Sequence, residues 1–322
     1  MVKNLKDLFA KFKDEAACRE LLIQQRWNGK PECPYCGHDK AYVIENGKRF
    51  KCANQTCYKK YSVTVGTVFE ASNIPLTTWF PAMYIIASHK KGISSVQLAK
   101  DLGVTQKTAW FMLHRIRESL KDNHPGLLSG TIEADEMYLA RKYRSDFKGL
   151  SEEEIDFKQQ NSRTSKGVVI ALAEVGGRVK TATMPETDSI AIRKIVSENV
   201  QEGSNIHTDQ HGMYNPLAEK YVHQSVNHSS HEWVRGNVTT NHVENFFGVM
   251  KRGIYGIYHQ ISYKHLDAYC NEFAYRYNSR KMADGRRFEL ALSSVKGRLT
   301  YKRLVYGKGK ENSQETNEKK SQ

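Results

Sequence analysis

The spacing of apolar residues predicts helices on both sides of a β-rich middle region. Apolar residues recur at helical spacing among charges near the N-terminus, which predicts an amphipathic helix over residues 1–28. A helical pattern returns from Leu76 to Leu120. Further along, the predicted elements are strands at 131–139, 168–175 and 178–184, a helix at 189–200, a strand at 205–209 and a helix after Val238. The last helix carries an apolar stripe of Val243, Phe246, Phe247, Met250 and Ile254.

The order of these elements predicts an α/β fold for residues 128–285. Three strands, a helix, a strand and a helix follow one another as in an RNase H-like mixed sheet flanked by helices. Within this domain, residues 141–166 are highly charged and predict a flexible insert. Residues 300–322 are expected to form a polar, disordered tail, with the poorest hydrophobic content from Gly307 onward.

The helical region at 76–122 has the pattern of a helix-turn-helix segment. Ser94 or Ser95 can cap a first helix, Gly103 supplies a turn, and Thr105 can cap a second helix. In a helix-turn-helix the second helix enters a DNA groove, although a generic helical hairpin would give the same pattern. The residues expected to be exposed there and to contact DNA are Gln106, Lys107 and Arg115, with Arg252 of the later helix as a further DNA contact.

Four cysteines are clustered within residues 29–70. Cys33 and Cys36 form one pair, and Cys52 and Cys57 form a second. Two such pairs place four thiolates around a tetrahedral site, which is the geometry that structural zinc accepts. Asn46-Gly47 is a hairpin turn signal between two short β-rich runs. The segment therefore predicts a zinc ribbon with Cys33, Cys36, Cys52 and Cys57 as ligands, and the alternative is a set of free thiols.

Composition adds a polyanionic partner to this picture. The chain has 322 residues with 49 Lys and Arg against 35 Asp and Glu, a net charge of +14. Such an excess favours nucleic acid as the partner. No apolar run approaches the roughly 18 residues that a membrane span needs, and the N-terminus has no hydrophobic signal core. We therefore expect a cytoplasmic, nucleoid-associated protein that binds no membrane.

Three acidic residues occur at positions where burial would ordinarily exclude them. Asp135 lies in the first predicted strand, Asp209 ends the fourth, and Glu244 lies in the following helix. In an RNase H-like sheet, carboxylates from these three places converge at one end. Converging carboxylates repel one another unless cations neutralise them, and hard oxygen ligands suit Mg²⁺ or Mn²⁺. Each acid alone has an ordinary explanation: Asp135 as a surface acid on an edge strand, Asp209 as a turn residue and Glu244 as part of a helix cap.

The helix after Val238 carries a second feature of interest on its polar face. Residues seven apart are nearly two turns apart, so Glu244 and Lys251 share a face, with Gly248 between them. This face offers a carboxylate for a metal ion and a cation for a phosphate, which suits contact with a DNA backbone.

Three sequence motifs resemble those of a known family. Asn241-His-Val-Glu-Asn-Phe-Phe-Gly-Val-Met-Lys-Arg252, Glu133-Ala-Asp-Glu-Met-Tyr138 and Thr208-Asp-Gln-His-Gly-Met-Tyr214 are similar to motifs of bacterial insertion-sequence transposases, in the group whose domain is called ISXO-two-like. The cysteine ribbon matches the N-terminal half of that group. The resemblance covers about residues 20–285.

The resemblance implies a DDE transposase. Asp135, Asp209 and Glu244 would bind two divalent cations, Mg²⁺ or Mn²⁺, and Lys251 would position DNA. The enzyme would bind the terminal inverted repeats of its element, cut at the ends with water, and join the freed 3′-hydroxyl to target DNA. Bringing two ends together would need at least a homodimer. Some members of the group have Asn at the third position, which leaves Asn241 as the alternative to Glu244.

Two other functions remain open from the sequence. The chain could be a non-catalytic DNA-binding derivative of a transposase, or an RNase H-like nuclease that cuts without joining. The presence of all three acids, the cysteine ribbon and the helix-turn-helix pattern favour the transposase.

Overall fold

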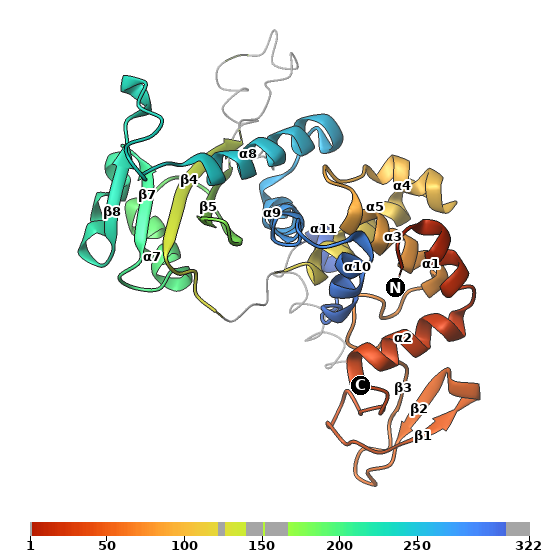
Figure 1. The fold of residues 1–322 in the computed structure, drawn as a ribbon. Helices are drawn as coiled ribbons and strands as arrows, with labels where there is room; N and C mark the ends of the chain where they lie inside the picture. The colour runs from red at the N-terminus through yellow and green to blue at the C-terminus, as the bar shows by residue number, and fades with distance from the viewer. Residues whose placement is uncertain (1, 122–125, 140–150, 152–166, 307–322) are drawn as a thin grey trace. The chain divides into compact units, whose positions relative to one another are not determined.

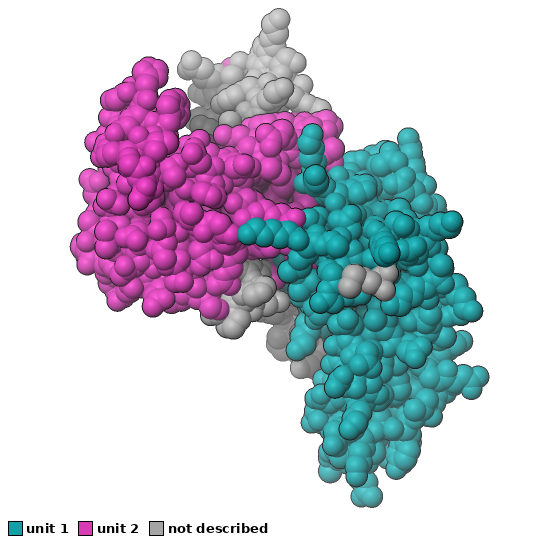
Figure 2. Space-filling model, in the orientation of Figure 1, with its two compact units in different colours: residues 1–120, 281–322 teal, residues 121–280 magenta. Residues whose placement is uncertain are grey.

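The chain forms two compact units in a computed structural model, which describes residues 2–121, 126–139, 151 and 167–306. Unit 1 comprises residues 1–120 and 281–322, and unit 2 comprises residues 121–280 (Figure 2). Apart from Ser151, the predicted insert at 141–166 lies outside the described residues, as do residues 307–322.

Unit 1 begins with two helices rather than the single helix predicted over residues 1–28. Helix α1 spans Leu5–Lys11 and α2 spans Glu15–Trp27. The break follows from a helix cap, because the side chain of Asp14 accepts a hydrogen bond from Ala17 N at 2.9 Å and starts α2. Between the helices, Phe12 turns inward and packs edge-on against Phe80, with ring centroids 5.0 Å apart.

A small antiparallel sheet follows in the cysteine-rich segment. Strands β1 (Ala41–Ile44), β2 (Arg49–Cys52) and β3 (Lys60–Tyr61) lie in that order. The turn η1 (Glu45–Gly47) joins β1 and β2, with Asn46 at φ 51° and Gly47 at φ 78°. Asn and Gly adopt such left-handed backbone angles more readily than other residues, which explains the Asn-Gly pair in this turn.

The helical part of unit 1 is organised around α3 (Leu76–Ser88), most of whose residues are buried. Helix α10 (Asp284–Ser293), distant in sequence, packs on α3 through Phe288, whose ring lies 5.7 Å from that of Phe80. Helix α11 (Tyr301–Tyr306) corrects the prediction of a disordered tail from residue 300. Burial of the apolar side chain of Leu304 stabilises this helix.

Helices α4 (Ser95–Leu102) and α5 (Gln106–Ser119) have the predicted boundaries. Ser94 Oγ accepts from Gln97 N at 3.1 Å, Thr105 Oγ1 accepts from Thr108 N at 3.2 Å, and Gly103 ends α4 with a φ of 65°. The apolar side of α5 is buried, and it includes Ala109, Met112, Leu113 and Ile116.

Unit 2 contains a five-stranded mixed sheet in the order β6-β5-β4-β7-β8 (Figure 1). The strands are β4 (Thr131–Leu139), β5 (Gly167–Glu174), β6 (Val179–Met184), β7 (Asn205–Asp209) and β8 (Val222–Val226). Strands β4, β7 and β8 are parallel, while β5 is antiparallel to both β4 and β6. The first four strands match the predicted ranges to within a residue, whereas β8 was not predicted.

Helices cover both faces of this sheet. Helix α7 (Ser189–Asn199) and the 3-10 segment η3 (Gly212–Glu219) pack on the face that carries Ile132 and Ala134. Helix α8 (Asn241–Gly253), the π-helical turn η5 (Ile254–Tyr258) and α9 (Tyr263–Asn278) pack on the face that carries Met137. Side chains alternate along a strand, so Glu133 and Asp135 point to the face covered by α8.

None of the helices in the described ranges is long and apolar enough to cross a lipid bilayer.

Candidate active site and metal centre

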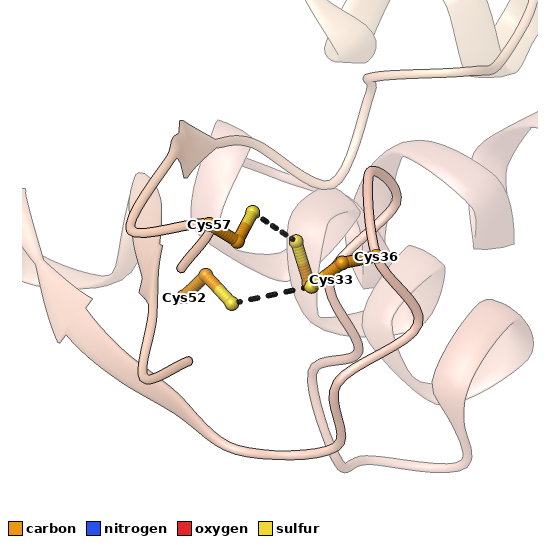
Figure 3. Close-up of side chains that lie close together, drawn as sticks. All are labelled: Cys33, Cys36, Cys52 and Cys57. Atoms are coloured by element: carbon orange, nitrogen blue, oxygen red, sulfur yellow. Dashed lines mark hydrogen bonds between the residues drawn. The ribbon is translucent and has the colours of Figure 1, made fainter. Parts of the chain in front are cut away.

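The four cysteines of unit 1 converge on one point (Figure 3). Their sulfurs all lie within 4.8 Å of one another, with Cys33 and Cys57 sulfurs 3.8 Å apart and Cys36 and Cys52 sulfurs 3.6 Å apart. A tetrahedral zinc ion with Zn–S bonds of about 2.3 Å requires sulfur separations of about 3.8 Å. The thiols therefore fit a structural zinc ion, while their separations are far longer than a disulfide bond of about 2.05 Å.

The sheet of unit 2 places two of the predicted acids side by side. Strands β4 and β7 are parallel neighbours, with Glu133 opposite His207. Two residues further along each strand are Asp135, in the middle of β4, and Asp209, the last residue of β7. The separation of Asp135 and Asp209 by more than seventy residues in sequence is thus closed by strand pairing.

Helix α8 brings the third acid and the lysine to the same place. A cavity of about 390 Å³ is lined by residues of β4, β7, α8 and the segment between β8 and α8. Its lining residues are Asp135, Asp209, His228, Trp233, Thr240, Glu244, Phe247, Gly248 and Lys251. The four residues to which the sequence assigned catalysis therefore share one cavity, with Glu244, Gly248 and Lys251 along one face of α8.

The acids in and around the cavity repel one another. Burial and the charges of Glu136, Asp209 and Glu244 raise the pKa of Asp135 to about 7. Within the described residues, the Oδ1 atom of Asp209 is buried and accepts no hydrogen bond. Acids that repel one another, with a lone pair left open, fit a divalent cation with oxygen ligands. Among the described residues, the four cysteines are the group of potential metal ligands whose donor atoms are gathered tightly enough to enclose one ion.

Two side chains outside the predicted set hold Glu244. Thr240 donates a hydrogen bond from Oγ1 to Glu244 Oε1 at 2.6 Å, and His228 Nε2 lies 3.3 Å from the same oxygen. Glu244 is exposed, which corrects the prediction that it occupies a buried position, and Asn241, the alternative third ligand, is exposed as well. Only Glu244 of the two lines the cavity. The geometry therefore favours Glu244 over Asn241.

Glu133 fixes the start of α8 on the sheet, a role that sequence reasoning missed. Its side chain is fully buried and accepts hydrogen bonds from His242 N at 2.6 Å and Val243 N at 3.1 Å. The ring Nδ1 of His242 lies 2.9 Å from the other carboxylate oxygen. An anionic cap suits the positive end of a helix. The i, i+2 spacing of Glu133 and Asp135 was the available signal, because both acids had to face α8.

Glu136 faces the other side of β4. Its carboxylate accepts a hydrogen bond from the hydroxyl of Tyr214, which lies in η3. Burial, with the charge of Asp209, raises the pKa of Glu136. Glu136 therefore adds negative charge behind the cavity without lining it.

The predicted DNA contacts divide into exposed and buried residues. Gln106, Lys107 and Arg252 are exposed, and the ammonium group of Lys107 lies 5.0 Å from the ring centre of Tyr301. Arg115 is only 3% exposed, which corrects the prediction that it lies on the surface of α5.

The physical reason is that Arg115 serves the interior of unit 1. Its guanidinium donates to the backbone carbonyl of Glu70 and lies over the rings of Trp79 and Phe111, at 5.6 and 5.3 Å. Burial lowers the pKa of Arg115 to about 10. A long side chain at the rim of a helix can reach inward as well as outward, which helical periodicity does not distinguish.

The chain combines a four-cysteine ribbon with a mixed sheet that carries acids in one cavity. This combination is typical of proteins that join a zinc ribbon to a DDE-type domain. Family comparisons agree with this class. Residues 127–278 match the family described as "ISXO2-like transposase domain", and residues 13–60 match the "Transposase zinc-ribbon domain". The chain belongs to this family of insertion-sequence transposases with an N-terminal zinc ribbon.

A curated relative comes from a mobile element. The chain is 28% identical over 257 residues to an "Uncharacterized protein in transposable element ISH50" of Halobacterium salinarum. The aligned region covers 75% of this chain and 83% of that protein.

Proposed function

We propose that this protein is a DDE transposase that cuts the ends of its insertion sequence and joins them to target DNA. The observation that carries the proposal is the single cavity containing Asp135, Asp209, Glu244 and Lys251. Family membership supplies the substrate, the ends of a mobile element. The order β6-β5-β4-β7-β8, with β5 antiparallel, supports the RNase H-like interpretation of the sheet.

The three acids are the residues that would hold Mg²⁺ or Mn²⁺. The open lone pair of Asp209 and the raised pKa of Asp135 are the observations that fit such ions. When bound, such ions would activate the attacking oxygen and stabilise the leaving oxygen at phosphorus. The three acids line one cavity together with Lys251, so bound ions would lie beside a cation that can hold a phosphate.

The residues of the chain itself would position DNA for this reaction. Lys251 would bind a phosphate beside the acids, and Arg252 would extend this contact along α8. Thr240 and His228 would keep Glu244 in place through the contacts at 2.6 and 3.3 Å. Water would attack first at the element's end, and the freed 3′-hydroxyl would then attack target DNA.

The binding of terminal inverted repeats would fall to unit 1. The capped pair α4 and α5 supports the helix-turn-helix interpretation, with Gln106 and Lys107 exposed at the start of α5. These two residues would contact DNA in a groove, whereas the buried Arg115 would not. Synapsis of two ends would require at least two copies of the chain, and such an enzyme would act on the nucleoid in the cytoplasm.

The proposal is tested by incubating the purified chain with duplexes that carry the element's ends, with Mg²⁺ or Mn²⁺. We expect nicks at the ends and joined products when target DNA is added. Asp209→Asn should abolish both, while Glu198→Gln should leave both unchanged, because Glu198 is an exposed acid on α7 that pairs with Lys194.

Other outcomes would identify other functions. Cutting without joining would indicate an RNase H-like nuclease. Binding of the ends without any cutting, under either cation, would indicate a non-catalytic DNA-binding protein and would contradict the proposal.

A further inference from the structure

Trp233 is an aromatic residue of the cavity that the proposed chemistry does not use. It lines the same cavity as the three acids, yet 54% of the residue is exposed. Tryptophan is usually among the most buried residues of a protein on average. A large ring left open beside charged side chains is therefore a candidate contact for a ligand with a flat face.

The segment that carries Trp233 is held by its own hydrogen bonds. Glu232 accepts from Arg235 at 2.8 and 2.5 Å and from Asn227 N at 3.2 Å. Backbone hydrogen bonds of 3.0 and 2.9 Å pair Arg235 with Val238. These hydrogen bonds close the segment into a compact loop, which fixes the backbone that carries Trp233.

One side of the tryptophan ring is occupied by His228. The two ring centroids lie 4.8 Å apart, with their planes inclined by 36°. His228 in turn contacts Thr240 Oγ1 at 3.2 Å and Glu244 Oε1 at 3.3 Å. The aromatic pair is thus connected directly to the acid that α8 brings to the cavity.

The chemistry of the cavity indicates what the exposed ring would bind. Lys251 offers a cation for phosphate, and an aromatic ring close to a phosphate site commonly stacks on a nucleobase. Bases within a duplex are already stacked on their neighbours, so only an unstacked base can reach such a ring. Stacking of this kind tolerates any base, because every base has a π face.

We propose that Trp233, supported by His228, stacks on a nucleobase that leaves the duplex beside the phosphate to be cut. This inference rests on the proposed function, because it takes the ends of the element as the DNA. It adds a nucleobase subsite to the cavity and assigns an unpaired nucleotide as the feature that it recognises.

The test is a cycle that combines substitutions of Trp233 with removal of single bases from the DNA. Duplex ends carry an abasic site at each position flanking the cleavage site, one position at a time. Wild type, Trp233→Ala and Trp233→Phe are compared, and Ile190→Ala serves as the control, since Ile190 is an exposed apolar residue on α7. Thermal unfolding and bound zinc verify that each variant is folded.

On intact duplex, Trp233→Ala should slow cleavage by about fivefold to about a hundredfold, the range expected for one base–aromatic stack. Trp233→Phe should retain most of the rate. At one abasic position, wild type and Trp233→Ala should cleave equally, because no base remains to stack. Ile190→Ala should match wild type on every substrate.

The outcomes separate this inference from the proposed function. Suppose that wild type cleaves, and that Trp233→Ala either has no effect or slows cleavage equally at every abasic position. The proposed nucleobase subsite is then wrong, while the proposed transposase function is unaffected. If wild type binds the ends without cutting, the same cycle is measured in Kd, and equal effects at all positions again contradict the subsite. If wild type binds no ends, both proposals fail.

Discussion

The cysteine cluster of unit 1 and the carboxylate cavity of unit 2 are both suited to metal ions, but they are built differently. The cysteines lie within 25 residues of one another in sequence and their sulfurs within 4.8 Å in space. The acids come from two strands and a helix and line an open cavity. A closed set of four ligands suits a structural ion, whereas an open set leaves room for substrate. Substitutions should therefore separate the two sites cleanly.

The largest expected effect is the loss of chemistry on removing a carboxylate from the cavity. Asp135→Asn should reduce end cleavage by about 10³-fold or more, because a cation at the reacting phosphate contributes several kcal/mol, at about 1.4 kcal/mol for each factor of ten. Single-turnover cleavage of labelled ends measures the change.

Zinc content provides the control for that substitution. Asp135→Asn should keep one zinc ion per chain and should bind the ends as wild type does. A loss of zinc together with cleavage would mean that the two sites are not independent.

The second effect is the loss of fold in the ribbon when a thiol is removed. Cys33→Ser should lose zinc and unfold the segment around β1 and β2, since structural zinc supplies about 10–16 kcal/mol of apparent binding free energy in small fingers. Metal analysis and proteolysis of the purified chain would show this. Binding of Mn²⁺ by the cavity should persist, and its disappearance would contradict the separation of the two sites.

A smaller effect is expected at Glu133, which touches the backbone of α8 rather than substrate. Replacing a residue that orients a metal ligand typically reduces affinity or activity by about 10–100-fold. Glu133→Ala should fall in this range, and Glu133→Gln should recover part of the loss because its amide oxygen can still accept from His242 N or Val243 N.

The measurements for Glu133 are Mn²⁺ affinity and cleavage well below the unfolding temperature. If Glu133 only stabilised the fold, its substitution would lower Tm but would leave Mn²⁺ affinity and cleavage unchanged at these temperatures. A positioning residue lowers Mn²⁺ affinity even in the fully folded protein, because Glu244 shifts relative to Asp135.

The mildest effect is the pH dependence of the cavity. Because burial and neighbouring acids raise the pKa of Asp135 to about 7, a cation must displace a proton below that pH. Mn²⁺ affinity should fall by about tenfold per pH unit below 7 and level off above it. Without a divalent cation, the same shift makes the fold less stable as pH rises from about 4 to about 7, since the carboxyl is protonated in the fold and ionised in the unfolded chain.

Calorimetric titration with Mn²⁺ on both sides of pH 7 measures this dependence. The ribbon offers the contrast, as zinc content should not change across the same range. A flat Mn²⁺ affinity below pH 7 would contradict the raised pKa.

The features that the sequence predicted well are those encoded by neighbouring residues. The caps at Ser94 and Thr105, the turn at Asn46-Gly47 and the cysteine pairs each depend on a few adjacent positions. The alternation along residues 131–139 likewise placed Asp135 on one face and Ala134 on the other. Local steric and hydrogen-bonding rules are sufficient for such features.

The features that escaped prediction depend on partners far away in sequence. Glu133 is recognisable as a helix anchor only when α8 is known to lie on β4. Its partner His242 follows it by 109 residues in the sequence. Arg115 has a helical position compatible with solvent, and only the rings of Trp79 and Phe111 explain its burial. Trp233 lies in a segment without periodicity, so no pattern indicated that it would line the cavity.

The most direct test of the account is a crystal structure of the chain soaked in Mn²⁺, with anomalous scattering used to locate the ions. We expect Mn²⁺ density bounded by Asp135, Asp209 and Glu244, and a separate zinc peak among Cys33, Cys36, Cys52 and Cys57. Absence of Mn²⁺ between the three acids at saturating concentration, or its binding elsewhere, would contradict the central claim that this cavity is the catalytic centre.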